Sequence, residues 1–249
     1  MPAHDEIAGW YDEAIREGAL APFHAWIVPI TVDLAGGVEV CRVCDLACGQ
    51  GVIARRLAER GARVLGVDTS EKLLDRARRY ERDEPRGIEY QRGDAQRLDA
   101  VPDGTFDGVV CNMSLMDIPD LDTTPGTVSR VLRSGGWFVF SVVHPISQTP
   151  GSPWWAREGD TVVGVEVRDY FAEGYWRRGN LEGVRGSLGA HHRTSSTDVN
   201  GLARAGLFIE RLLEPRATGE YADLAPVHRQ VPAALVVRCV KRGGAGGWK

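Results

Sequence analysis

Residues 43–51, VCDLACGQG, form an apolar run that ends in a carboxylate and passes at once into a glycine-rich turn. Such a run is typical of a buried β-strand, and the residues after the turn, from Val52 onward, have helical spacing. A strand, a glycine turn and a helix in this order are typical of the repeating unit of parallel α/β sheets. The glycines let a ligand approach the backbone closely, and Asp45 places a negative charge beside it.

The same alternation of strands and helices continues along the chain. Apolar, β-branched runs predict strands at residues 40–46, 64–67, 88–91, 106–111 and 137–143. Helical spacing lies between them, at residues 52–60, after the capping candidate Ser70, and at 124–132. A helix at 198–205 precedes two strand-like runs, 207–213 and 233–240, which a polar loop separates. We therefore predict an α/β fold, a Rossmann-like doubly wound sheet of seven strands, mostly parallel, with a C-terminal antiparallel hairpin.

Length and charge narrow the classes of function. A chain of 249 residues can bury one sizeable core, so a single domain is expected. The formal net charge of −4 provides no electrostatic footprint for nucleic acid. No segment approaches the roughly 20 apolar residues of a membrane span, and acidic residues interrupt the first 20 positions, which argues against a secretory signal. We expect a cytoplasmic protein with neither a nucleic-acid nor a membrane partner.

The cysteines do not predict a metal site. Cys41 and Cys44 fall in a strand-like run, where they point to opposite faces, so the spacing that they form with Cys48 does not gather ligands. We expect reduced, buried thiols and no bound metal.

Two ligand classes are compatible with the glycine turn. Residues 49–54 satisfy GxGxxA, and Asp68 ends the next strand, where a ribose-binding acid belongs, so a dinucleotide such as NAD is one reading. Asp45 argues against it, because a pyrophosphate would already bring concentrated negative charge to the same edge. A ligand that carries cationic groups and a ribose suits this turn better.

The stretch 45–51, DLACGQG, resembles motif I of the class I S-adenosylmethionine (SAM) methyltransferases, and the likeness extends to the small-molecule branch of type 11 and type 25 enzymes. SAM carries a sulfonium and an ammonium and no phosphate. The resemblance implies that Gly49 and Gly51 approach the methionyl part and that Asp45 complements its charge. Ala47 stands where the family has its first glycine.

Other motifs follow in the family's order. "GVDTS" resembles the end of the second strand, where the resemblance implies that Asp68, followed by Thr69, holds the ribose hydroxyls. "GDAQRL" resembles the adenine loop, with Asp94 accepting from the exocyclic amine and Ala95 offering its backbone N–H. "CNMSLMDIPD" and "LRSGGWFVFSVVHP" resemble the segments at the fourth and fifth strands. The remaining positions carried over from the family are Asn112 and Met113 at the methyl end and Tyr11 near the methionine carboxylate.

The resemblance also divides the single domain into functional parts. We expect an N-terminal helical lid (1–35), a SAM-binding core (36–149), a substrate cap (150–192), a C-terminal helix and hairpin (193–242) and a flexible tail (243–249). The stretch 150–192 is rich in glycine and aromatic residues and breaks the alternation, as functional loops do.

The sequence says less about the methyl acceptor. Transfer of a methyl group from a sulfonium depends mainly on alignment, and a base is needed only for a protonated acceptor. His144 and His192 are the candidate bases, and Trp154, Trp155, His191 and Arg193 are the candidate substrate contacts. We expect a small organic acceptor, with oxygen preferred over nitrogen or carbon. An NAD-dependent oxidoreductase and a SAM-binding protein without catalysis are the alternatives, and the sequence leaves open whether the chain forms a homodimer.

Overall fold

The computed structural model describes residues 3–120, 123–152, 154–177 and 183–243. Its helices are α1 (Ala3–Arg16), α2 (Ala21–Ala35), α3 (Val52–Glu59), α4 (Glu71–Asp83), η1 (Leu115–Asp117), α5 (Thr123–Val131), α6 (Gly183–Ser187), α7 (Ser195–Arg204), α8 (Gly219–Leu224) and η2 (Pro226–Arg229). Its strands are β1 (Arg42–Leu46), β2 (Arg63–Asp68), β3 (Glu89–Arg92), β4 (Phe106–Asn112), β5 (Leu132–Val143), β6 (Trp154–Glu158), β7 (Thr161–Glu166), β8 (Gly174–Trp176), β9 (Ala190–His192), β10 (Leu207–Leu213) and β11 (Ala234–Lys241).

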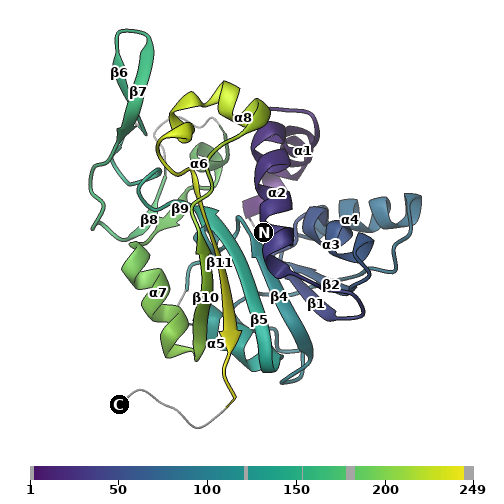
Figure 1. Cartoon of the computed structure of the whole chain (residues 1–249). Helices are drawn as coiled ribbons and strands as arrows, with labels where there is room; N and C mark the ends of the chain where they lie inside the picture. Colours follow the sequence, from purple (N-terminus) through teal and green to yellow (C-terminus); the bar gives the residue numbers. More distant parts are fainter. Residues whose placement is uncertain (1–2, 121–122, 153, 178–182, 244–249) are drawn as a thin grey trace.

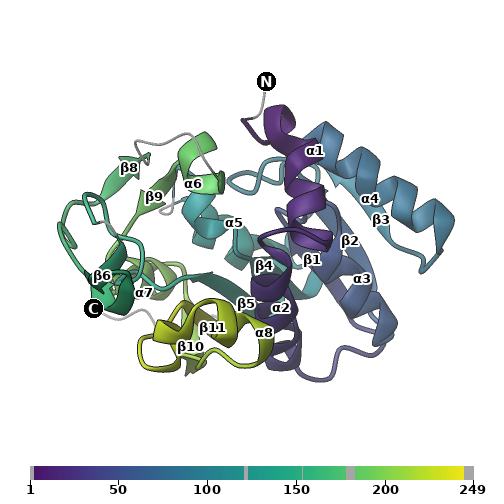
Figure 2. The same ribbon diagram turned by 90° about the horizontal axis from the view of Figure 1, so that it is seen from above.

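The central sheet has seven strands in the order β10-β11-β5-β4-β1-β2-β3. The strands from β5 to β3 are parallel, whereas β11 pairs antiparallel with both β5 and β10. Helices α2 and α3 cover one face of this sheet, and α5 and α7 cover the other (Figures 1 and 2). The predicted doubly wound sheet with its C-terminal antiparallel hairpin is therefore confirmed.

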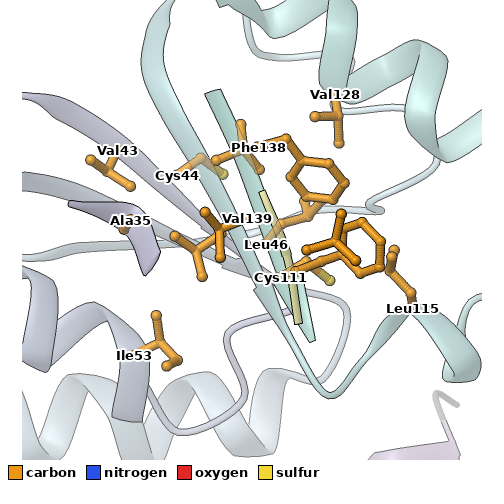
Figure 3. Packing of buried hydrophobic residues seen from close by; sticks show 14 of the residues in the cluster. Ala35, Val43, Cys44, Leu46, Ile53, Cys111, Leu115, Val128, Phe138 and Val139 are labelled. Carbon is orange, nitrogen blue, oxygen red and sulfur yellow. The ribbon is translucent and has the colours of Figure 1, made fainter. Parts of the chain in front are cut away.

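Apolar side chains on both faces of the sheet form the core. Val43, Leu46 and Val139 project from the central strands. Ile53 of α3 lies on one side of the sheet, and Val128 of α5 lies on the other side (Figure 3). All five of these side chains are at most 3% exposed. Burial on both faces explains why β1 and β4 are mostly apolar in sequence and lack the alternation of a half-exposed strand.

The structure differs from the sequence-based expectation at the start of β5. The pattern predicted a helix to residue 132, a Ser-Gly-Gly turn and a strand from 137, but the strand begins at Leu132 and runs through the glycines. The pairing of β4 with β5 shifts register between Phe106 and Gly108, and Gly135 has a φ of 73°. An irregularity of this kind allows glycines to lie inside a strand. The sequence pattern alone predicts a turn at such glycines.

The segment between β5 and α7 contains short elements of its own. Strands β6 and β7 form a hairpin that projects from the body of the molecule, and β8 pairs with β9 (Figure 1). The expected polar loop between β10 and β11 contains α8 and η2.

The first helix is fixed to α4 by polar contacts. Ser70 Oγ donates to Asp5 Oδ1 at 2.5 Å, Arg76 donates to Asp12 Oδ2 at 2.9 Å, and the Tyr80 hydroxyl donates to both oxygens of Asp12 at 2.9 Å. These contacts hold α1 above the carboxyl ends of β1 and β2 (Figure 2). Among the described helices, no single one is long and apolar enough to cross a membrane, and α1 and α2 pass that test only as a pair bent by 80°.

Candidate functional site

The turn after β1 adopts the left-handed backbone that its glycines favour. Gly49 and Gly51 have φ angles of 55° and 85°, and Gly51 is the N-cap residue of α3. Ala47 also has a positive φ, 56°, a conformation that glycine adopts more readily than alanine. A Cβ added at Gly49 would meet no atom within 4 Å, so the backbone there borders open space. The turn thus presents bare peptide groups to a cavity.

Asp68 fixes this turn from the neighbouring strand. Its Oδ2 accepts from the Gly49 N–H and its Oδ1 from the Ser70 N–H, both at 2.8 Å. The residue is 9% exposed, and burial raises the pKa of its carboxyl above the ordinary value. Each oxygen keeps a lone pair, so the carboxylate can accept two further hydrogen bonds from a ligand.

A first cavity, with an open volume of about 780 Å³ that includes the solvent at its mouth, lies at the carboxyl edge of β1, β2 and β4, where open α/β sheets bind ligands. Seven predicted cofactor residues line it: Tyr11, Ala47, Gly49, Asp68, Thr69, Asp94 and Ala95. The sequence reasoning missed several further lining residues: His4, Leu73, Gly93, Gln96, Ser114, Asp117, Ile118 and Pro119. Asp94 accepts from the Gln96 backbone N–H at 2.9 Å, which shapes the loop that carries Ala95.

Four predicted cofactor residues lie outside this lining. Asp45 is 1% exposed and accepts from the Ala54 N–H of α3 at 2.8 Å, and burial raises its pKa to about 8. Gly51 lies at the start of α3, and Asn112 Oδ1 accepts from the Thr31 and Ser141 hydroxyls. Met113 lines a different cavity.

This second cavity adjoins the first. It has an open volume of about 1180 Å³ and is lined by Tyr11, Ala19, Leu20, Phe23, His24, Met113, Asp117, Val143, Ser147, Gln148, Trp155, Val184, Arg185, Tyr221, His228 and Ala233. Among these described residues, Tyr11 and Asp117 also line the first cavity. A ligand in the first cavity and another in the second would meet between these two side chains.

Aromatic rings form one wall of the second cavity. The Phe23 and Tyr221 rings are 5.1 Å apart edge to face, Tyr221 stacks on His228 at 5.8 Å, and Trp155 lies 5.4 Å from His228. Trp155 comes from the β6–β7 hairpin, and Tyr221 and His228 come from α8 and η2. Such a wall favours a planar or apolar ligand.

The polar groups of the second cavity carry little net charge. Arg185 Nη1 donates to Asp117 Oδ1, and their side chains are 10% and 15% exposed. Burial lowers the pKa of His24 to about 4 and also lowers that of His228, so both imidazoles are neutral at pH 7. Burial, and next the negative charge of Asp117, raise the pKa of Tyr11, which therefore keeps its proton.

The predicted bases are engaged elsewhere. His144 is 6% exposed, its Nε2 lies 2.9 Å from Glu214 Oε1, and its Nδ1 accepts from the Ile146 N–H at 3.3 Å. His192 Nε2 lies 2.8 Å from the Tyr170 carbonyl oxygen. His144 is absent from the lining of either cavity as described, whereas His192 borders a third cavity of about 430 Å³.

Of the four predicted substrate contacts, Trp155 lines the second cavity. His191 and Arg193 border the third cavity, which shares Val143 and Gln148 with the second. Arg193 donates to the carbonyl oxygens of Leu115, Ile118 and Pro119 and so holds η1 in place. The side chain of Trp154 lies outside the described part of the structure.

The chain is similar to known methyltransferases in sequence and in fold. Residues 44–140 match the methyltransferase domain family. A crystal structure of an S-adenosylmethionine-dependent methyltransferase from Mesorhizobium loti is similar with a TM-score of 0.73 and 33% identity, covering 85% of this chain and 96% of that one. A ubiquinone biosynthesis O-methyltransferase from Bordetella avium is 31% identical, over 55% of this chain and 57% of that protein. The chain spans about half the length of the curated O-methyltransferases that it matches.

A Rossmann-like seven-stranded sheet with a cavity at the glycine turn places the chain among the doubly wound α/β proteins, which bind ligands at the carboxyl ends of their strands. With the 33% identity along nearly the whole of a solved relative, the chain belongs to the S-adenosylmethionine-dependent methyltransferases, and the cofactor of that family is SAM.

Proposed function

We propose that the protein transfers a methyl group to a small organic acceptor bound in the second cavity, with oxygen as the preferred acceptor atom. The observation that carries this proposal is the pair of adjoining cavities, which share Tyr11 and Asp117. The first cavity has the open backbone at Gly49 and the free lone pairs of Asp68 that a nucleoside with a cationic tail requires. The second is large enough for a small organic molecule.

Each predicted cofactor residue that lines the first cavity has a role in this proposal. Asp68 accepts from the ribose hydroxyls, with Thr69 beside it, and Asp94 and Ala95 contact the adenine. Ala47 and Gly49 border the methionyl part, and Tyr11 closes the cavity from α1. Asp45, Gly51 and Asn112 support these groups from behind, and Met113 faces the acceptor. When bound, SAM supplies a methyl group on a positively charged sulfur.

The second cavity limits the acceptor's chemistry. The aromatic wall suits a planar or apolar body, and the paired charges of Asp117 and Arg185 leave no surplus charge for a strongly ionic one. The relatives named O-methyltransferases support a small molecule methylated on oxygen. We place the reaction in the cytoplasm, without a nucleic-acid or membrane partner.

Cofactor binding tests the first part of the proposal. In calorimetry, S-adenosylhomocysteine (SAH) should bind and NAD should not. Asp68→Asn should weaken SAH binding by about 1.5–3 kcal/mol, roughly 10- to 150-fold in Kd, because a carboxylate is lost as hydrogen-bond acceptor. Asp99→Asn, at an exposed ion pair with Arg97, is the matched control and should bind as the unchanged protein does.

Turnover tests the second part. The purified protein with SAM is screened against hydroxylated, amino and enolic small molecules, with bulk RNA and protein as competitors. Methylation of a hydroxylated compound is the expected result. Binding of NAD in place of SAH, or methylation of a polymer in preference to every small molecule, would contradict the proposal.

A further inference from the structure

The junction between the two cavities is the place where a methyl group must cross. Tyr11 from α1 and Asp117 from the end of η1 are the described residues that border both spaces. A nucleophile of the acceptor must therefore lie beside one or both side chains when it meets the methyl carbon. The groups at this junction decide what can happen to a proton on that nucleophile.

Asp117 is held rigidly at the junction. The Asp117 N–H donates to the Ser114 carbonyl oxygen at 2.8 Å, which closes the η1 turn. Arg185 of α6 donates from Nη1 both to Asp117 Oδ1 and, at 2.8 Å, to the Gly189 carbonyl oxygen. One carboxylate oxygen is thus taken by the guanidinium, while Oδ2 has no hydrogen bond among those described and is available to a ligand.

The other polar groups in and around the two cavities are less suited to receive a proton at the junction. Tyr11 keeps its own proton, and His24 and His228 line the second cavity without reaching the first. His144 and His192 are occupied by Glu214 and the Tyr170 carbonyl. Asp68 borders the first cavity alone and accepts from two backbone amides. Asp117 is therefore the carboxylate that both ligands would meet.

We propose that Asp117 is the catalytic base of this enzyme and that Arg185, from the segment between β5 and α7, is its positioning residue. The inference rests on the proposed methyl transfer to a protonated oxygen. As the bond between the acceptor oxygen and the methyl carbon forms, the bond between that carbon and the sulfur breaks, and the hydroxyl proton passes to Asp117 Oδ2. The sulfur keeps the electron pair, the positive charge is lost, and the proton later leaves to solvent.

Asp117→Asn keeps the shape of the side chain and removes the proton acceptor. With an acceptor whose hydroxyl is protonated at the assay pH, kcat should fall by about 10²–10⁴-fold, the range for loss of a general base. With an acceptor of the same ring whose hydroxyl is already ionised, the loss should shrink to less than about tenfold, because no proton remains to be taken. Asp103→Asn, which breaks the exposed ion pair with Arg130, is the matched control and should keep full activity.

Two further measurements separate catalysis from folding and from cofactor binding. The Kd for SAH of Asp117→Asn should stay within about threefold of the unchanged protein, since the proposed role lies in the chemical step. Arg185→Lys should retain more of kcat than Arg185→Gln, because a lysine can still pair with Asp117.

The outcomes distinguish this inference from the proposed function. An active wild-type enzyme whose Asp117→Asn variant loses kcat equally with both acceptors, or not at all, overturns the inference and leaves the methyl transfer intact. A large loss of SAH affinity in that variant would assign Asp117 to the cofactor instead and also overturns it. A wild-type protein that binds SAH but methylates no acceptor overturns the proposed function, and the inference falls with it.

Discussion

The Asp45 carboxylate was predicted from the sequence to lie beside the ligand. In the structure this carboxylate is buried behind the turn. It is 1% exposed, and its oxygen accepts from the Ala54 N–H, so it joins the end of β1 to the first turn of α3. Negative charge at a helix N-terminus is favourable, but burial opposes the ionised form and raises the pKa to about 8. The carboxylate therefore costs stability in the free protein at neutral pH.

Because of this cost, Asp45→Asn should change the free energy of unfolding by an amount that depends on pH. The pKa of the Asp45 carboxyl is higher in the folded state than in the unfolded state. The protonated carboxyl therefore stabilises the fold below about pH 4, and this contribution is lost as the pH rises toward 8. An amide does not titrate, and its oxygen can still accept from Ala54. Relative to wild type, the variant without ligand should gain stability between pH 5 and pH 8, on the order of 1 kcal/mol or more.

Urea unfolding of both proteins at pH 5 and pH 8 measures this difference. The exposed Asp99→Asn variant controls for the loss of one surface charge and should show no such trend. A stability difference between Asp45→Asn and wild type that stays constant over this pH range would show that the buried carboxyl does not titrate there.

At the scale of elements, the turn between β1 and α3 rests on a side chain from β3. Gly51 has a φ of 85°, and a Cβ at this position would overlap the Tyr90 hydroxyl. That hydroxyl is buried and has no hydrogen-bond partner among the described residues. The turn thus depends both on the backbone freedom of Gly51 and on the Tyr90 ring that packs against it.

Gly51→Ala should lower the free energy of unfolding by about 1–3 kcal/mol through backbone strain and overpacking. Adding Tyr90→Phe removes the nearest atom and should restore part of the loss, whereas the strain of the positive φ remains. Tyr90→Phe alone should be neutral or stabilising, since it removes an unpaired buried hydroxyl. Thermal unfolding of the three variants tests this, and equal stability of the single Gly51→Ala variant and the double variant would contradict it.

The sequence predicted the elements that follow simple periodicity. The runs that became β1, β2 and β4 were placed to within about two residues, because strands buried on both faces are continuously apolar. The true start of β5 was missed, since the register shift that admits Gly135 depends on its partner strand. Strands as short as β8 (Gly174–Trp176), and α8 within the polar loop, carry too few residues for a pattern.

The candidate site could likewise be predicted from the sequence only where its residues follow a local pattern. Ala47, Gly49, Asp68 and Asp94 could be predicted to lie together, because they follow strands whose carboxyl ends share one edge. Asp117 lay within a motif that was recognised, yet its importance depends on Arg185, 68 residues further along the chain. No local pattern reports a contact over such a separation. The histidines were chosen by type and position, and their hydrogen bonds to Glu214 and Tyr170 become visible once the chain is folded.

At the scale of the whole molecule, the two cavities are built from parts far apart in the chain. Helix α1 borders both through Tyr11, α6 contributes Arg185, and the β6–β7 hairpin contributes Trp155 (Figure 1). A ligand that shifts Tyr11 or Asp117 in one cavity therefore changes the wall of the other. Such sharing predicts energetic coupling between the two binding events.

We expect SAH to raise the affinity for the acceptor, by about fivefold or more. Reciprocity requires the acceptor to raise the affinity for SAH by the same factor. Calorimetric titration of each ligand in the absence and presence of a saturating amount of the other measures both factors. Unchanged Kd values in both directions would show that the two ligands bind independently and that the shared residues do not couple the two cavities.

The position of β11 has a consequence for how the protein is made. This strand lies inside the sheet, between β5 and β10, although residues 234–241 leave the ribosome after every other strand. Until then β5, with Phe138 and Phe140 along it, is an open edge that can pair with another chain. A nascent chain of this topology completes its sheet only once β11 has emerged, and its exposure to aggregation is set by the time needed to translate the segment from β5 to β11.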